Sequence, residues 1–284
     1  MPLVAKNFDT HITVNREIFV EGIKKAVTTI GFEDNRPLYL CLLFDASKNG
    51  VKFTAGTGAQ FVIDEIVGNA IVEEAAKQRV AFPKNNISNI ISILKSSTDE
   101  KIVVKEAINP KDAPEQIVIT AGETVLTILG IDPQWKTKYV DVAIVTGTDH
   151  PYRVKVKRDE NILSFVGIAR STLTPEYRMQ SDVHNSELTF DFKKCVVDVN
   201  SKTNVEAKWR TKFEVDRAGT ESKMTLLCNS IYLEDMLTKG VDKDFTIRFI
   251  QQDKPIVVDF DPIDNSVKGT VEKFTMFFTT SKKQ

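Results

Sequence analysis

The chain shows the same order of predicted elements twice, and this repetition limits the folds open to it. In the first half, hydrophobic residues recur at helical spacing over 16–30 and 84–96, with strand-like segments before, between and after them. The second half repeats this succession, with helical spacing over 158–170 and 230–239. Because the halves share little identity, the repeat lies in the order of elements. The alternative is a coincidence within an ordinary two-domain protein.

The length and the turn signals predict two domains. A chain of 284 residues corresponds to about two domains of ordinary size. Turn-forming residues gather at 147–151, near the midpoint. We therefore expect an α+β protein with domains at 1–147 and 148–284, the first ending in a connector that covers about 133–150. In each domain, two helices would pack on antiparallel sheets.

Local signals also predict where individual elements end. Asn15 is suited to cap the first helix, and Gly31 is suited to end it. Asn49-Gly50 lies between the strand-like runs 38–44 and 51–55, a pattern that predicts a hairpin.

Charge and composition exclude several classes of protein. The chain has 38 Lys and Arg residues against 39 Asp and Glu residues, so its net charge is −1. This balance excludes a generally basic nucleic-acid coat but leaves room for a local basic face. No apolar run is long enough to span a membrane, and the first residues lack the apolar core of a signal peptide. The 3 widely spaced cysteines fit a reducing compartment, so we expect a cytoplasmic protein.

Motifs for catalysis or cofactor binding are not evident. Gly56-Thr-Gly58 begins like a dinucleotide fingerprint, but Phe61 stands at the third glycine position and a strand pattern follows. The 3 histidines lie far apart, and neither a phosphate-loop lysine motif nor a His-Glu-x-x-His motif is present. We therefore expect no metal, no cofactor and no enzymatic activity. The alternative, a two-domain enzyme or ligand binder, would show a deep pocket with converging titratable groups.

Basic residues accompany all four predicted helices, on their polar sides or at their ends. They are Arg16, Lys24, Lys25, Lys84, Lys95, Lys157, Arg158, Arg170 and Lys239. For a single helix, a solvated face is the simpler interpretation. Four helices alike favour a common surface that meets a polyanion. Acidic residues on the same helices dilute this charge, so the contact should be loose, salt-sensitive and independent of nucleic-acid sequence.

Three segments carry a resemblance to a known family. Residues 229–258, NSIYLEDMLTKGVDKDFTIRFIQQDKPIVV, are similar to the last helix of the DNA sliding clamps, its following strand and a Lys-Pro-apolar turn. Residues 80–104 resemble the equivalent helix of the preceding domain, with its Val-x-x-Pro-Lys start. Residues 51–63 stand where the family has Thr-Asp-Gly-His-Arg-Leu, although the His-Arg pair is absent. The likeness is to the bacterial replicative polymerase beta subunit, and it is poor over 171–225.

The resemblance implies a fold, an assembly and partners. In the family, each domain places two helices inside a ring of six domains and its sheets outside. The bacterial subunit has three domains and closes as a dimer, so two domains per chain imply a homotrimer. The resemblance further implies a non-catalytic processivity factor that encircles duplex DNA, binds a DNA polymerase and is opened by a clamp loader. A bacterial cell or a phage-infected cell would suit such a chain.

The resemblance also implies a pocket for partner peptides. In the family, polymerases and loaders insert a short hydrophobic peptide into an apolar cleft between the last two domains. Carried over position by position, its walls would be Gly56, Phe61, Pro133, Trp135, Val140, Met276 and Phe278. The alternative is that Phe61, Met276 and Phe278 are core residues. Trp135 lies in a polar stretch, where an aromatic side chain more often serves as a partner anchor.

An open form of the same fold is the main alternative function. A clamp-fold processivity factor or clamp decoy that never closes would hold DNA by charge alone. It should bind linear DNA directly with steep salt dependence, whereas a ring should slip off free ends.

Overall fold

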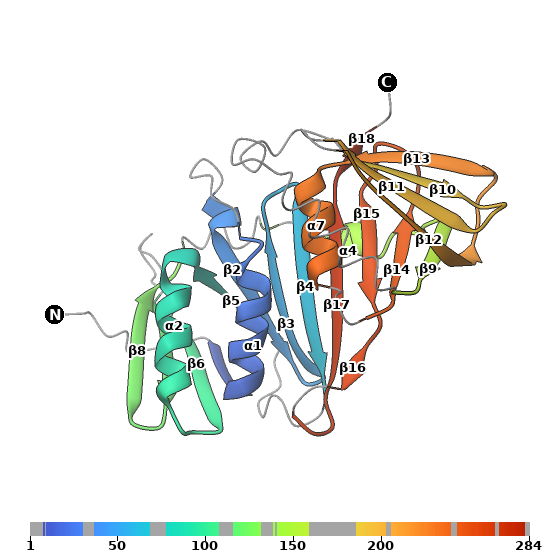
Figure 1. The fold of residues 1–284 in the computed structure, drawn as a ribbon. Coiled ribbons are helices and arrows are strands. Elements are labelled where there is room, and N and C mark those ends of the chain that lie inside the picture. The colour runs from blue at the N-terminus through green and yellow to red at the C-terminus, as the bar shows by residue number, and fades with distance from the viewer. Residues whose placement is uncertain are drawn as a thin grey trace. The chain divides into compact units, whose positions relative to one another are not determined.

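The structure is a computed structural model. It describes residues 8, 10–30, 37–68, 78–107, 116–131, 139, 141–158, 186–202, 206–239, 243–264 and 267–281. The chain divides into two compact units (Figure 1). Unit 1 comprises Met1–Val140 and Pro262–Phe274, and unit 2 comprises Asp141–Asp261 and Thr275–Gln284. The sequence-based boundary at 147–150 lies a short way inside unit 2, and no sequence signal predicted the segment that returns to unit 1.

Unit 1 combines two helices with two antiparallel sheets. Its elements are β1 (Thr10–Asn15), α1 (Arg16–Val27), η1 (Pro37–Leu40), β2 (Cys41–Ser47), β3 (Gly50–Gly56), β4 (Gln60–Val67), β5 (Gln78–Pro83), α2 (Lys84–Ser96), β6 (Lys101–Ala107), β7 (Gln116–Ala121), β8 (Thr124–Leu129), β16 (Ile263–Asp264) and the start of β17 (Val271–Phe278). One sheet has the order β1-β6-β7-β8, and the other contains β5-β2-β3-β4.

The two helices begin where the sequence predicted. The side chain of Asn15 accepts hydrogen bonds from the backbone N–H groups of Glu17 and Ile18, at 2.9 and 3.2 Å, so it caps α1 as expected. α1 ends at Val27, before Gly31 is reached. α2 follows Pro83 directly and ends at Ser96, in agreement with the predicted range.

The core of unit 1 lies between the helices and both sheets. Phe19 of α1 meets Phe44, Phe53 and Phe82 edge-on, with ring centroids 5.1, 6.0 and 5.6 Å apart. The core continues through apolar residues of β1, α2, β6, β7 and β8, and Val267 of the returning segment packs against it. Figure 1 shows α1 and α2 side by side across the strands, which leaves their polar sides turned away from this core.

In unit 2, the described strands belong to one large sheet. Its elements are α4 (Val142–Thr146), β9 (Tyr152–Val156), β10 (Ser186–Asp191), β11 (Val196–Lys202), β12 (Glu206–Arg217), β13 (Lys223–Cys228), α7 (Ser230–Lys239), β14 (Phe245–Phe249), β15 (Ile256–Phe260), the end of β17 and β18 (Thr280–Ser281). The strand order is β18-β13-β10-β11-β12-β9-β14-β15-β17. The helix predicted at 158–170 lies almost wholly outside the described residues.

The predicted α+β class, with helices on antiparallel sheets, is thus confirmed. In the described part of the chain, no helix has both the length and the apolar character that a membrane crossing needs.

Arg248 joins the sheet of unit 2 to its first helix. It donates to both carboxylate oxygens of Asp259 and to the carbonyl oxygen of Thr146, at 2.5, 3.2 and 2.9 Å. Its Nη1 also lies 3.4 Å from Nδ1 of His150, a buried residue. Burial and the positive charge of Arg248 hold the pKa of His150 below its usual value of 6.5. Asp259 opposes this shift, and Arg153 adds to it.

The buried histidine makes stability fall in mild acid. At pH above 6.5, His150 is neutral in the folded and unfolded states; as the pH drops, the unfolded chain takes up a proton first. The free energy of unfolding should therefore fall from pH 6.5 toward pH 5, and His150→Gln should reduce that fall. Urea titrations of the wild type and of His150→Gln between pH 6.5 and pH 5 measure the two falls in unfolding free energy. Parallel pH dependences of the two proteins would show that the pKa of His150 is not lowered.

Gly50 occupies a position that only glycine fits. Ser47 pairs with Gly50 across the β2–β3 hairpin, so the predicted hairpin is confirmed. Gly50 has a φ of +150°, and an added Cβ would lie 2.1 Å from the carbonyl oxygen of Ile66. Gly269 offers a matched comparison, because its φ is +81° but nothing lies within 4 Å of an added Cβ.

Alanine at these two glycines should separate backbone strain from steric overlap. Gly269→Ala should lose about 1 kcal/mol of unfolding free energy, from left-handed strain alone. Gly50→Ala should lose a further 1–3 kcal/mol or so, because the hairpin must also shift away from Ile66. Urea unfolding followed by circular dichroism measures both losses. Equal losses would mean that the β3–β4 backbone moves aside without cost.

Candidate nucleic-acid interface

Five of the predicted DNA-contacting residues lie on α1 and α2 of unit 1. They are Arg16, Lys24, Lys25, Lys84 and Lys95. Because α1 and α2 lie side by side (Figure 1), the fold brings these residues to neighbouring helices, as a common basic face requires. Their hydrogen bonds and ion pairs show how much of this charge is available to a ligand.

Arg16 donates hydrogen bonds to carbonyl oxygens at the C-terminal end of α2. Its Nε donates to the carbonyl oxygen of Asp99 at 2.6 Å, and its Nη1 donates to that of Leu94 at 3.1 Å. The last carbonyl groups of a helix lack partners within the helix, so a guanidinium here satisfies them and suits the helix dipole. Arg16 therefore links the start of α1 to the end of α2.

Lys24 and Lys25 are both held by carboxylates. Lys24 forms an ion pair with Glu21 on the same helix. Lys25 pairs with Glu272 of the returning segment at 2.5 Å, and the Glu272 side chain is only 3% exposed. The Lys25–Glu272 pair holds its lysine more firmly than the Lys24–Glu21 pair does, because a buried carboxylate needs a compensating charge far more than an exposed one does.

Lys84 and Lys95 lie at opposite ends of α2 and differ in environment. The Nζ of Lys84 donates to the carbonyl oxygen of Ile30 at 3.3 Å, and burial lowers the pKa of this ammonium group. Lys95 is exposed in the last turn of α2. It makes no ion pair with any residue that the structure describes. Of the five basic residues, Lys95 alone presents an uncommitted charge.

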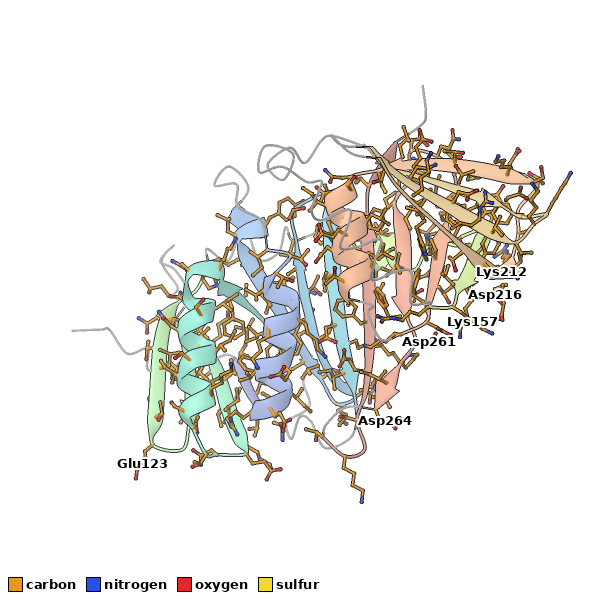
Figure 2. All side chains as sticks on the ribbon, viewed as in Figure 1. Glu123, Lys157, Lys212, Asp216, Asp261 and Asp264 are labelled. Atoms are coloured by element: carbon orange, nitrogen blue, oxygen red, sulfur yellow. The ribbon has the colours of Figure 1, made fainter. Side chains whose placement is uncertain are left out.

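The basic residues predicted in unit 2 are only partly described. Lys157, which points outward in Figure 2, pairs with Glu214 at 2.7 Å and lowers the pKa of that carboxyl group. The backbone N–H of Arg158 donates to Asp244 at 3.1 Å. Arg170 lies outside the described residues. Lys239 ends α7, and its side chain is likewise outside the description. The DNA-binding role of all nine residues stays a prediction.

The residues predicted to line a partner pocket are buried where they are described. An added Cβ at Gly56 would lie 2.3 Å from the ring of Phe61, and that ring packs against Tyr39 and Tyr139. Met276 and Phe278 are buried in β17. Their burial agrees with the core alternative considered for Phe61, Met276 and Phe278. The other three positions, Pro133, Trp135 and Val140, lie outside the described residues, so the pocket stays a prediction.

β8 is an open edge of the smaller sheet. It pairs with β7 on one side and with no described strand on the other. Val125 and Leu129 are 62% and 60% exposed on this strand. Glu123 lies at the tip of the β7–β8 hairpin (Figure 2). An exposed apolar edge strand is a template for pairing with another chain.

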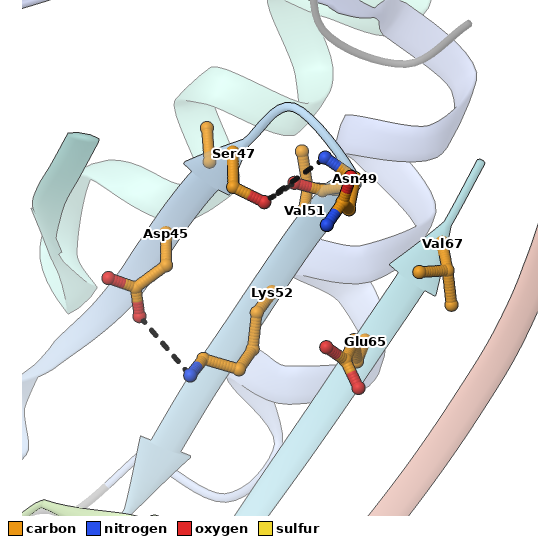
Figure 3. Close-up of a pocket in the computed structure, with 9 residues that line it drawn as sticks. Asp45, Ser47, Asn49, Val51, Lys52, Glu65 and Val67 are labelled. Carbon is orange, nitrogen blue, oxygen red and sulfur yellow. Dashed lines mark hydrogen bonds and ion pairs between the residues drawn. The ribbon is translucent and has the colours of Figure 1, made fainter. Parts of the chain in front are cut away.

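Signs of an enzyme site are weak among the described residues. The depression in Figure 3 lies over the β2–β3 hairpin, where Asp45 pairs with Lys52 at 3.9 Å and with Arg79 at 2.7 Å. These charges follow the strand register, as cross-strand pairs do, and need no ligand to balance them. Burial raises the pKa of the Cys41 thiol to about 12 and also raises that of Cys228, so neither is a ready nucleophile. The described residues contain no cluster of potential metal ligands.

Comparison with known proteins gives matches only among solved structures. No family model matches the chain, and no curated protein matches it. A protein of Eubacterium rectale, assigned provisionally as a DNA polymerase III beta subunit, matches with a TM-score of 0.73 and 14% identity, over 99% of this chain and 67% of its own. The sliding clamp of Caulobacter crescentus matches with a TM-score of 0.71 and 15% identity, over 100% of this chain and 68% of its own.

A third match supports the same conclusion about the fold. The DNA polymerase III beta subunit of Pseudomonas aeruginosa has a TM-score of 0.69 and 12% identity, over 100% of this chain and 69% of its own. These likenesses show that the whole chain has the fold of about two thirds of a beta sliding clamp. The resemblance drawn from residues 51–63, 80–104 and 229–258 is thereby confirmed at the level of fold.

The two lysine pairs of α1 should differ in their effect on stability. Lys25→Met should reduce the unfolding free energy by roughly 1 kcal/mol, because it weakens the compensation of the buried Glu272 carboxylate. Lys24→Met is the matched control and should cost no more than about 0.5 kcal/mol, as for an exposed helical pair. Chemical denaturation of both variants makes the comparison. A larger loss in Lys24→Met would contradict the assigned roles.

Proposed function

We propose that this protein is a DNA sliding clamp, which encircles duplex DNA and tethers a polymerase for processive synthesis. The observation that carries the proposal is the likeness of the entire chain to beta sliding clamps, at TM-scores of 0.69 to 0.73. The polarity of the described helices fits this role, because α1 and α2 turn their apolar sides to the core and their polar sides outward. In this proposal the protein performs no catalysis, and its partners are duplex DNA, a polymerase and a clamp loader.

The proposed assembly is a ring of three chains. This chain matches about two thirds of each beta clamp, so it would supply two of the three domains that the resemblance gives to such a subunit. Six domains then require three copies. The open β8 edge in unit 1 supports such closure, because a ring needs each copy to pair head-to-tail with the next. Val125 and Leu129 would be covered at that junction.

Charged residues on β8 should break the ring. Three chains of 31.9 kDa give a mass of about 96 kDa, which light scattering over a dilution series would report for the wild type. Val125→Lys with Leu129→Lys should leave monomers, because lysine on an edge strand opposes pairing. The control is Ile144→Lys, since Ile144 is 72% exposed on α4 rather than on an edge. A wild-type monomer at every concentration would favour the open, charge-held form.

Encirclement can be tested without a loader. A ring threaded on linear duplex DNA should become trapped when the DNA ends are ligated, and it should then stay with the DNA in high salt. Cutting the circle should release it. A charge-held protein would leave the circle in high salt, because its affinity depends on phosphate contacts. Failure to trap protein on ligated circles would overturn the proposed function.

A further inference from the structure

The solvent face of α2 carries amide and hydroxyl groups rather than charge. Five of its exposed residues are Asn85, Ser88, Asn89, Ser92 and Lys95, and we call these five the amide–hydroxyl face. The sixth, Ser96, donates to the carbonyl oxygen of Ile93 at 2.7 Å. Their spacing places them on one side of the helix, opposite the buried Ile87, Ile90 and Leu94. Within the part of the chain that the structure describes, none of the five side chains has a hydrogen-bond or ion-pair partner. Their donors are therefore available to a ligand.

α2 also differs in its acidic residues from α1 and α7, the other long helices that the structure describes. Its sequence, KNNISNIISILKS, contains no carboxylate, and a lysine stands at each end. α1 carries Glu17 and Glu21, and α7 carries Glu234 and Asp235. A surface helix that lacks carboxylates along two or three turns does not repel a polyanion. The amide–hydroxyl face therefore offers hydrogen-bond donors and one lysine to a phosphate backbone without a carboxylate that would repel it.

The basic side chains of α1, the helix beside α2, each have a partner within the protein. Arg16 binds carbonyl groups at the end of α2, Lys24 is paired with Glu21, and Lys25 is paired with the buried Glu272. Drawing Lys25 toward a phosphate would weaken the compensation of a carboxylate that is 3% exposed. The cations of α1 therefore offer less free charge to a phosphate than their number suggests.

We propose that unit 1 meets the sugar–phosphate backbone of duplex DNA through the amide–hydroxyl face of α2, in which Lys95 is the charged member. This inference rests on the proposed clamp function and assigns its DNA contact to particular residues. Asn and Ser side chains donate to phosphate oxygens regardless of base sequence, so they position DNA without reading it. Because neutral donors displace few counterions, the contact should depend only weakly on salt.

A carboxylate placed within this face should repel DNA. Ser88→Asp should weaken binding to a short linear duplex roughly tenfold at low ionic strength, measured by fluorescence anisotropy. Ser222→Asp makes the same chemical change at an exposed serine of unit 2 and should leave binding unchanged. Light scattering confirms that both variants assemble like the wild type. Equal affinities of the two variants would overturn the proposal. If the wild type slips off the linear duplex too quickly for a titration, the same two variants are compared on ligated circles, where equal retention would overturn it.

The salt dependence tests which lysine meets DNA. Lys95→Gln should reduce the slope of log K against log salt by about 0.9 for each lysine removed from phosphate. Lys24→Gln, its matched control, should leave the slope unchanged because Lys24 is paired with Glu21. The reverse result would show that the paired lysines are the ones that bind DNA. If wild type and variants are trapped equally on ligated circles while Ser88→Asp binds normally, this inference fails and the clamp function stands.

Discussion

The packing of Phe19 determines where the polar sides of the two helices of unit 1 lie. Its ring is buried against Phe44, Phe53 and Phe82, which come from three strands of one sheet. Aromatic groups this closely packed have few alternative arrangements, so the rotation of α1 about its own axis is defined. Once that rotation is set, α2 packs beside α1 over the same core, and the amide–hydroxyl face of α2 is directed to solvent.

Several basic side chains of this protein stabilise the fold rather than remain available to a ligand. Lys25, Arg16 and Arg248 each join segments that lie far apart in the sequence. Each binds a carboxylate or a carbonyl oxygen of the distant segment. Counting lysines and arginines on helices therefore overstates the charge that a ligand meets. The proposed ring would not need that charge, because topological linkage would keep it on DNA and weak neutral contacts would permit movement along the backbone. The net charge of −1 is consistent with that arrangement.

Local sequence signals predicted much of the fold. The cap at Asn15, the extent of α2 and the β2–β3 hairpin all depend on neighbouring residues, and all were predicted correctly. The strand predicted at 38–44 begins only at Cys41, because the residues after Pro37 form the short helix η1 instead. Proline fixes one backbone angle and removes a donor, which suits a helical turn better than a strand interior.

The site could not be predicted to the same degree, because its chemistry depends on long-range partners. Lys25 and Glu272 are 247 residues apart, and the spacing of hydrophobic residues along the chain does not predict an ion pair between them. The absence of carboxylates from α2 was visible in the sequence, but its meaning depends on knowing which neighbouring cations are already bound. The burial of Phe61 agrees with a core role and leaves its pocket role a prediction. That burial depends on which elements pack against the strand, and the alternation of residues along one strand does not show this.

The return of residues 262–274 to unit 1 bears on how the protein is made. Val267 packs on the core of unit 1, Thr270 and Gly269 lie against Gly68, and Glu272 meets Lys25. A ribosome adds residues from the N-terminus, and domains usually fold in that order. Here the first unit synthesised cannot complete its packing until nearly all of the second has emerged. The packing of unit 1 is therefore completed together with that of unit 2 rather than before it.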